Sequence, residues 1–196
     1  MTQTLPVVTD LGPSQGLARY LSEVNEAPIL TAAEEKALAQ RYHDEHDLDA
    51  ARQLVFSHLR YVVSIARGFS GYGLPLADLI QEGNVGLMKA VKRFDHQRDV
   101  RLVSFAVHWI KAEIYDYVVR NWRMVKVATT KAQRKLFFNL RKLKAHIGAL
   151  DEGDLRPEQV IEISNRLQVS ETEVINMNRR LGGGDHSLNA PLRDEG

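Results

Sequence analysis

The sequence has no cysteine among its 196 residues, which excludes disulfides, thiol nucleophiles and zinc sites with cysteine ligands. It has no apolar run near the roughly 20 residues that a membrane span needs, and its start lacks the basic and apolar regions of a signal peptide. Hydrophobic residues make up 44% and charged residues 26%, which is typical of a folded globular chain. We therefore expect a soluble, cytoplasmic protein with no membrane partner.

Motifs for catalysis and metal binding are missing as well. The sequence contains no HExxH, no G-x-S-x-G and no Walker loop, which disfavours a hydrolase or a nucleotidase. Its one metal-like cluster is His43-x-x-His46 amid acidic residues, and a solvated helix end is the favoured explanation. We expect no enzymatic activity, no metal and no cofactor.

Charge is divided unevenly along the chain, although the formal net charge is only +1. Residues 89–146 contain 15 Lys and Arg but 4 Asp and Glu, so the rest of the chain is acidic. The same basic window holds eight of the 14 aromatic residues. Basic charge interleaved with aromatics is typical of surfaces that bind single-stranded or distorted nucleic acid. A solvated basic face around core aromatics is the alternative, and composition leaves both open.

Apolar residues recur at spacings of three and four, and strict alternation is missing, so the predicted fold class is all-α. Capping signals and turn residues place helices at about 16–25, 31–45, 75–94, 102–122, 130–147, 157–167 and 171–181, with another that Asp47 can cap and that ends before the turn at Gly71. Thr31 and Ser170 open capping boxes, Asp47 caps the third helix, and Thr129 or Thr130 caps the sixth. Residues 149–156 are predicted to form a linker.

The helix at 102–122 has two apolar sides. An aliphatic stripe, expected to face the core, consists of Val103, Val107, Ile110, Ile114 and Val118. Phe105, His108, Trp109 and Ala112 project from roughly the other side, with Lys111 and Tyr115 on the flank. Large aromatics opposite a core stripe need a partner, which is either another helix of this chain or unpaired bases. On the second interpretation, the phosphate ligands at the ends of the helix are Arg98, Arg101, Arg120, Arg123 and Lys126.

The preceding helix carries another face that core packing does not explain. Its buried stripe is expected at Leu79, Ile80, Leu87, Ala90, Val91 and Phe94. The opposite side carries Asp78, Gln81, Glu82, Val85 and Met88. An apolar centre with a polar rim is typical of a docking surface. A solvated face with two stray apolar residues is the alternative.

From about Ala18 to Leu192 the chain resembles the bacterial RNA polymerase sigma factors of the sigma-seventy superfamily, and most closely the heat-shock members. One long segment resembles the family's polymerase-binding and DNA-melting block: SHLRYVVSIARGFSGYGLPLADLIQEGNVGLMKAVKRFD. The segment VSFAVHWIKAEI resembles the helix that recognises the minus-ten promoter element. The segment QRKLFFNLRK resembles a stretch that distinguishes the heat-shock members.

The resemblance implies a domain organisation and a function. The chain would comprise a flexible N-terminus (1–15), a polymerase-binding and minus-ten-recognition domain (16–126), a region-three helical domain (127–182) and a linker tail (183–196). It would bind core RNA polymerase, direct it to heat-shock promoters and nucleate melting. Chaperones and a protease are further partners that the resemblance suggests. The family continues into a domain that reads the minus-thirty-five element, so we expect a shortened chain that lacks it.

The resemblance also assigns roles to individual residues. Contacts to the clamp helices of the largest catalytic subunit of the polymerase fall to Asp78, Gln81, Glu82, Asn84 and Met88. In the non-template strand, Phe105 would stack on the flipped-out adenine of the minus-ten element beside Ser104, with His108 and Trp109 at the upstream edge of the bubble. The upstream base pair would lie at Ala112 and Tyr115, with Lys111 in reach. The extended minus-ten duplex would approach Thr130, Lys131 and Gln133.

Two other function classes compete with this interpretation. The helix pair at 157–181 mimics a helix-turn-helix, as in a stand-alone repressor, but its acidic residues outnumber its basic ones until its end. A pure protein-docking module is the second alternative, and the basic aromatic window disfavours it.

Overall fold

The computed structural model describes residues 13–123, 128–147 and 153–182. All regular elements within these residues are helices, which confirms the predicted all-α class. The chain divides into two compact units, residues 1–118 and 119–196. This division lies inside a helix, whereas the sequence places the domain junction at 126/127. Residues 1–12 of the expected flexible N-terminus and the whole linker tail lie outside the described residues.

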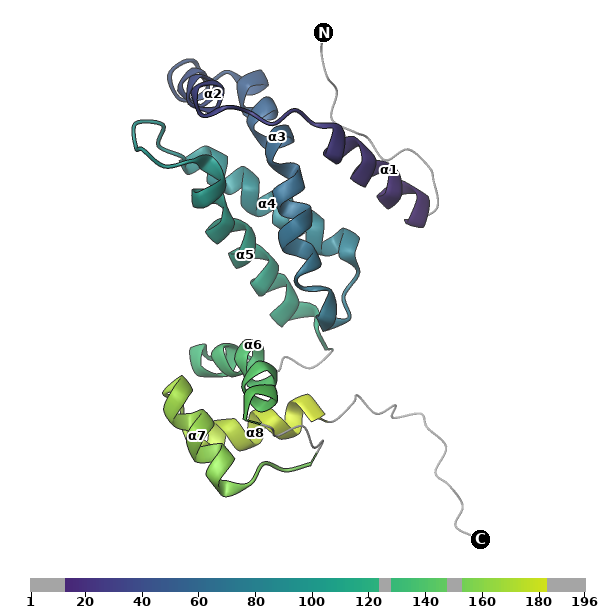
Figure 1. The fold of residues 1–196 in the computed structure, drawn as a ribbon, viewed down its shortest axis with the longest axis vertical. Helices are drawn as coiled ribbons and strands as arrows, with labels where there is room; N and C mark the ends of the chain where they lie inside the picture. Colours follow the sequence, from purple (N-terminus) through teal and green to yellow (C-terminus); the bar gives the residue numbers. More distant parts are fainter. Residues whose placement is uncertain (1–12, 124–127, 148–152, 183–196) are drawn as a thin grey trace. The chain divides into compact units, whose positions relative to one another are not determined.

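The helices follow the predicted ranges closely (Figure 1). The first unit contains α1 (Pro13–Glu26), α2 (Ala32–Glu45), α3 (Leu48–Arg67), the short 3₁₀ helix η1 (Ser70–Tyr72), α4 (Leu76–Arg93) and most of α5 (Leu102–Asn121). The second contains the end of α5 with α6 (Lys131–His146), α7 (Pro157–Leu167) and α8 (Glu171–Gly182). None of the described helices has the length and apolar character needed to cross a membrane.

Side-chain caps fix where the helices of the first unit begin. The Thr31 hydroxyl accepts from the Glu34 amide at 3.3 Å, and the Glu34 carboxylate accepts from the Thr31 amide at 2.8 Å. At the start of α3, the Asp47 carboxylate accepts from the amides of Asp49 and Ala50 at 2.9 and 3.2 Å. These bonds satisfy amides that have no acceptor inside the helix, so the predicted caps at Thr31 and Asp47 are confirmed.

The core of the first unit is built around α3, which packs against α1, α2 and α4. Its fully buried side chains are apolar and come from every helix of the α3–α5 group: Leu54, Val62, Leu79, Ile80, Leu87, Leu102, Ile110 and Ile114. Burial of this kind stabilises the fold by roughly 1.5–3 kcal/mol per large side chain.

The backbones of α4 and α5 approach closely at Gly86. A Cβ atom on this residue would lie 2.7 Å from the Ile110 Cα and 2.7 Å from the Trp109 carbonyl oxygen. Real Cβ atoms do not come so near backbone atoms, so only glycine fits at this crossing. The contact brings the two helices that carry the predicted interaction faces together.

The predicted core stripe of α5 is right at one end and wrong at the other. Ile110, Ile114 and Val118 are buried as expected. Val103 and Val107 are only half-buried, and Leu102 and Ala106 lie in the core instead. The buried positions keep a spacing of four residues along the whole helix, and at its start the Leu102 amide donates to the buried Glu35 carboxylate at 2.7 Å. Phe94, expected to be buried, is also half-buried.

The second unit is a small bundle of α6, α7 and α8 around an apolar core of Leu136, Phe137, Leu140, Val160, Ile163, Val174 and Met177. Two lysines of α6 tie the other helices to it. Lys135 donates to the Leu167 carbonyl at 2.7 Å, and Lys144 donates to the buried Asn178 side chain at 3.0 Å. These bonds satisfy buried polar groups that would otherwise destabilise the unit.

Candidate functional site

The outer face of α4 is open to solvent where the sequence predicts a docking surface. Asp78, Gln81 and Met88 are exposed, and the Met88 side chain is 46% accessible although it is apolar. Glu82 and Val85 are half-buried. The expected arrangement of an apolar centre and a polar rim is therefore present on the surface of the first unit.

Asp78 is held in place by the neighbouring helix. The Tyr117 hydroxyl on α5 donates to the Asp78 carboxylate at 3.2 Å. Burial, followed by the negative charge of Asp78, raises the pKa of Tyr117 above its usual value, so the phenol keeps its proton. The bond orients the carboxylate at one end of the α4 face.

Asn84 is turned away from this face, toward α1. Its amide nitrogen donates to the Tyr20 hydroxyl at 3.2 Å, and its carbonyl oxygen is buried with no hydrogen-bond donor among the described residues. Burial raises the pKa of Tyr20, which keeps this hydroxyl neutral. The sequence gives no sign of the pairing, because the two residues are 64 positions apart. Polymerase contact by Asn84 stays a prediction.

The aromatics of α5 form a cluster at the surface. The Phe105 ring lies 6.2 Å from Trp109 and 6.0 Å from Phe94, centroid to centroid. The Arg93 guanidinium stacks over the Trp109 ring at 4.4 Å. Phe105 and Trp109 are each half-buried. The end of α4 thus covers most of these rings and leaves a minor part of each accessible, so stacking on unpaired bases stays a prediction.

Other residues predicted to contact DNA lie on the exposed face of the same helix. Ser104, His108, Lys111 and Ala112 are exposed, and Tyr115 is 38% accessible. This face and the aromatic cluster are adjacent on α5, which is the arrangement that capture of unpaired bases requires. Arg93 was missed by the sequence analysis, although it lies within the basic window.

Arg101, predicted to bind phosphate, is engaged by a buried carboxylate. Its Nε and Nη2 donate to Glu35 at 3.1–3.3 Å, and Nη2 also donates to the Leu30 carbonyl at 3.2 Å. The hydrogen bonds to Glu35 and the charge of that carboxylate raise the pKa of Arg101. Glu35 is only 2% accessible, and His58 Nε2 lies 3.4 Å from it. The sequence does not reveal this cluster, because its members come from three helices.

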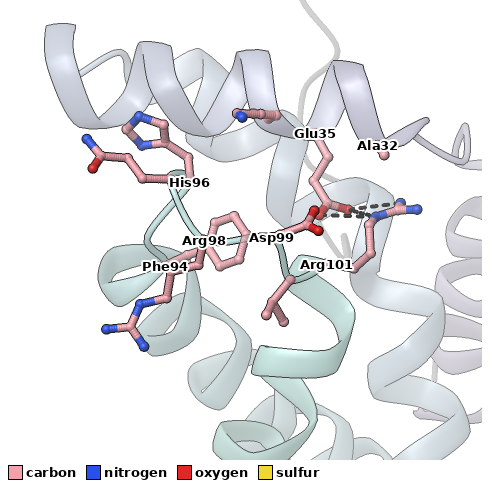
Figure 2. Close-up of a pocket in the computed structure, with 10 residues that line it drawn as sticks. Ala32, Glu35, Phe94, His96, Arg98, Asp99 and Arg101 are labelled. Carbon is pink, nitrogen blue, oxygen red and sulfur yellow. Dashed lines mark hydrogen bonds and ion pairs between the residues drawn. The ribbon is translucent and has the colours of Figure 1, made fainter.

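A pocket of about 360 Å³ lies between α2 and the turn that joins α4 to α5. Figure 2 shows Glu35 and Arg101 facing each other on one side, with Phe94, His96 and Arg98 along the turn. Arg98 donates to Asp95 at 3.2 Å, so its charge is shared with a neighbouring carboxylate. The lining combines Lys36, Arg98 and Arg101 with Glu35 and Asp99, so its positive and negative charges nearly balance.

Arg123, at the end of α5, is used within the second unit. Its guanidinium stacks on Trp122 at 4.3 Å and donates to the Arg180 carbonyl at 3.1 Å. Trp122 in turn packs edge-to-face on Phe137 at 5.0 Å. Arg120 is exposed. Lys126 lies outside the described residues, so its predicted phosphate contact has no structural description.

Two of the residues predicted to contact the extended minus-ten duplex form the cap of α6. The Thr130 hydroxyl accepts from the Gln133 amide at 3.2 Å, and the Gln133 side-chain oxygen accepts from the amides of Thr129 and Thr130 at 3.0 and 3.4 Å. Lys131 is exposed, with no hydrogen bond or ion pair to any described residue. Of the three, Lys131 has the freest side chain for a DNA contact.

The described residues contain no group of three or more histidine or acidic side chains arranged for a metal ion. His43 Nδ1 lies 3.1 Å from the Asp44 carboxylate, and the His43 ring meets His96 edge-on at 5.4 Å.

Comparison with known proteins bears on both predicted faces. A family model described as Sigma-70 factor, region 1.2 matches residues 17–48, and one described as Sigma-70 region 2 matches residues 54–124. These ranges cover almost all of α1 to α5.

Similar curated proteins match over nearly the whole chain. The RNA polymerase sigma factor RpoH of Caulobacter vibrioides is 53% identical over 186 residues, which is 95% of this chain and 63% of that protein. The RpoH proteins of Rhizobium radiobacter and Zymomonas mobilis are 54% and 51% identical, over 97% and 100% of this chain and 62% and 65% of their own lengths. The chain thus spans just under two thirds of the length of these relatives.

Proposed function

We propose that this chain, which carries regions 1.2 and 2 of the sigma-70 family, acts in transcription initiation as a sigma factor of the heat-shock type. It binds core RNA polymerase, directs it to heat-shock promoters, recognises the minus-ten region and nucleates melting there. The resemblance to RpoH over at least 95% of the chain supports the heat-shock assignment. Its role is that of a specificity subunit and not of an enzyme.

The observation that carries the proposal is the pairing of two accessible faces on adjacent helices. The face of α4 with Gln81 and Met88 suits the clamp helices of the largest polymerase subunit, since an exposed methionine with a polar rim supplies burial and register together. The face of α5 with Phe105 and Trp109 suits unpaired bases of the non-template strand, since both rings are partly accessible and lie beside the exposed residues His108 and Ala112.

Further partners follow from the resemblance alone. Chaperones and a protease are included in the proposal on that basis, as is a cytoplasmic location.

Base capture is tested by Phe105→Ala in the holoenzyme. Loss of one stacking ring should reduce the free energy of promoter opening by about 1–3 kcal/mol and leave the affinity of the closed complex nearly unchanged. Permanganate footprinting of the minus-ten thymines measures the opened fraction directly. Phe138→Ala, in the half-buried ring of α6, is the matched control. An undiminished bubble with the Phe105 variant would contradict base capture by this ring.

A further inference from the structure

The turn that joins α3 to α4 lies against the outer face of α5. The Phe69 ring meets the Tyr115 ring at 5.0 Å and an interplanar angle of 81°, and Tyr72 follows 6.3 Å from Phe69. The lower ends of α3 and α5 meet here in Figure 1. This row of rings makes the turn continuous with the exposed surface that carries Lys111 and Ala112.

The turn and the helix before it are positively charged. Residues 50–77 contain no Asp or Glu, and their arginines are Arg52, Arg60 and Arg67. Arg52 pairs with Asp49 at 3.0 Å, and Arg60 donates to the carbonyls of Asn25 and Ala27 at 3.0 and 2.6 Å. Arg67 is different, because its exposed guanidinium has no hydrogen bond or ion pair to any described residue. Lys111 is also exposed, and it has no hydrogen bond or ion pair to any described residue.

Gly71, at the tip of the turn, is a glycine that the fold does not require. A Cβ atom there would meet nothing within 4 Å, and its φ is negative, in contrast to Gly73 with φ +75°. Ser70 and Gly71 are both exposed, and the Ser70 hydroxyl donates to the Arg67 carbonyl at 2.9 Å, so the turn is held next to Arg67 with open space at Gly71.

We propose that Arg67, Ser70 and Gly71, together with Lys111 across the row of rings, bind the phosphate backbone of duplex DNA just upstream of the minus-ten element. The inference rests on the proposed function, which puts the upstream base pair at Ala112 and Tyr115. Duplex DNA carries one negative charge per about 1.7 Å of axis, so a cationic surface bordering the base-reading face meets phosphates. Phosphate contacts fix the register of the protein on the duplex and read no sequence.

Two neighbouring carboxylates do not neutralise the positive charge of this surface. Asp78 accepts a hydrogen bond from Tyr117 on the side of α4, and Asp116 is half-buried on α5. Neither belongs to the turn, whose residues 67–75 contain no acidic side chain.

The first test uses Arg67→Ala in holoenzyme assembled with core RNA polymerase. The probes are a fork-junction DNA whose duplex extends upstream of the minus-ten element, and a single-stranded oligonucleotide of that element alone. For the fork, the slope of log affinity against log salt should become shallower by about one. The variant should then lose about 3.5-fold less affinity than the wild type between about 50 and 200 mM salt. Affinity for the single strand should not change.

The second test places charge at Gly71, where the structure imposes no packing demand. Gly71→Glu should weaken fork binding and Gly71→Lys should strengthen it, each with the corresponding change in salt slope. Gln53→Glu and Gln53→Lys, at an exposed position in the other half of α3, are the matched controls. An unchanged slope for Arg67→Ala, or Gly71 variants that behave like the Gln53 pair, would overturn the inference. Failure of the wild-type holoenzyme to bind either probe would overturn the proposed function as well.

Discussion

Glu35 shows how a single buried side chain joins three helices. Its carboxylate on α2 accepts from Arg101 and from the first amide of α5, and it lies 3.4 Å from His58 on α3. A buried carboxylate persists only when it is paired and hydrogen-bonded, and here Arg101 supplies the charge and the Leu102 amide a further hydrogen bond. The start of the helix that carries the aromatic cluster is therefore fixed by a residue of region 1.2.

Two substitutions of Glu35 separate the contribution of its charge to stability from that of its hydrogen bonds. Glu35→Ala leaves the Leu102 amide without an acceptor and Arg101 without its carboxylate partner, so we expect a loss of about 2–4 kcal/mol in the free energy of unfolding. Glu35→Gln keeps an acceptor and should lose less. Urea denaturation of both variants measures the difference. A Glu35→Ala protein as stable as the wild type would show that the cluster is not structural.

Several residues that the sequence assigns to DNA also serve the fold. Arg101 uses two of its three guanidinium nitrogens for Glu35 and Leu30, which leaves Nη1 for a phosphate. Gln133 uses its side-chain oxygen for the cap of α6, which leaves its amide nitrogen as a donor. Their predicted DNA contacts are compatible with these bonds, provided that the remaining donors face the nucleic acid.

At the scale of helices, the crossing of α4 and α5 holds the two interaction faces in one geometry. Gly86→Ala would place a methyl group 2.7 Å from backbone atoms of α5 that cannot move independently. We expect this overpacking to cost about 1–3 kcal/mol and to shift the two faces relative to each other. The melting temperature of Gly86→Ala is compared with that of Gly71→Ala, where the added methyl group meets nothing within 4 Å. Equal melting temperatures would contradict the close crossing.

Local signals predicted most of the helices. Thr31 and Asp47 form the expected caps, because capping depends on residues within one turn of each other. The burial of Leu102 at the start of α5 was not predictable in this way, since the acceptor for its amide lies 67 residues away on α2. The support of Phe105 by Phe94, and the engagement of Asn84 by Tyr20, are likewise tertiary contacts. The exposed face of α4 was predictable, because it follows directly from the helical period.

At the scale of the whole molecule, the energetics require a partner. Opening about a dozen base pairs loses roughly 1.4 kcal/mol of stacking per step, on the order of 15 kcal/mol. Stacking two bases on Phe105 and Trp109 returns about 2–6 kcal/mol. On the proposed function, the chain alone would nucleate opening at only one or two steps, and contacts made by core polymerase would hold the rest of the bubble.

The central claim, that the outer face of α4 docks on core RNA polymerase, is tested most directly by competition binding. Wild-type chain and Gln81→Arg compete for core polymerase, with Gln53→Arg on the exposed side of α3 as the control and circular dichroism confirming helicity. A bulky charge beside the apolar centre of this face should weaken binding at least about tenfold, because it would be buried without a partner in the complex, while the control competes like the wild type. Equal competition by Gln81→Arg and wild type would contradict the account.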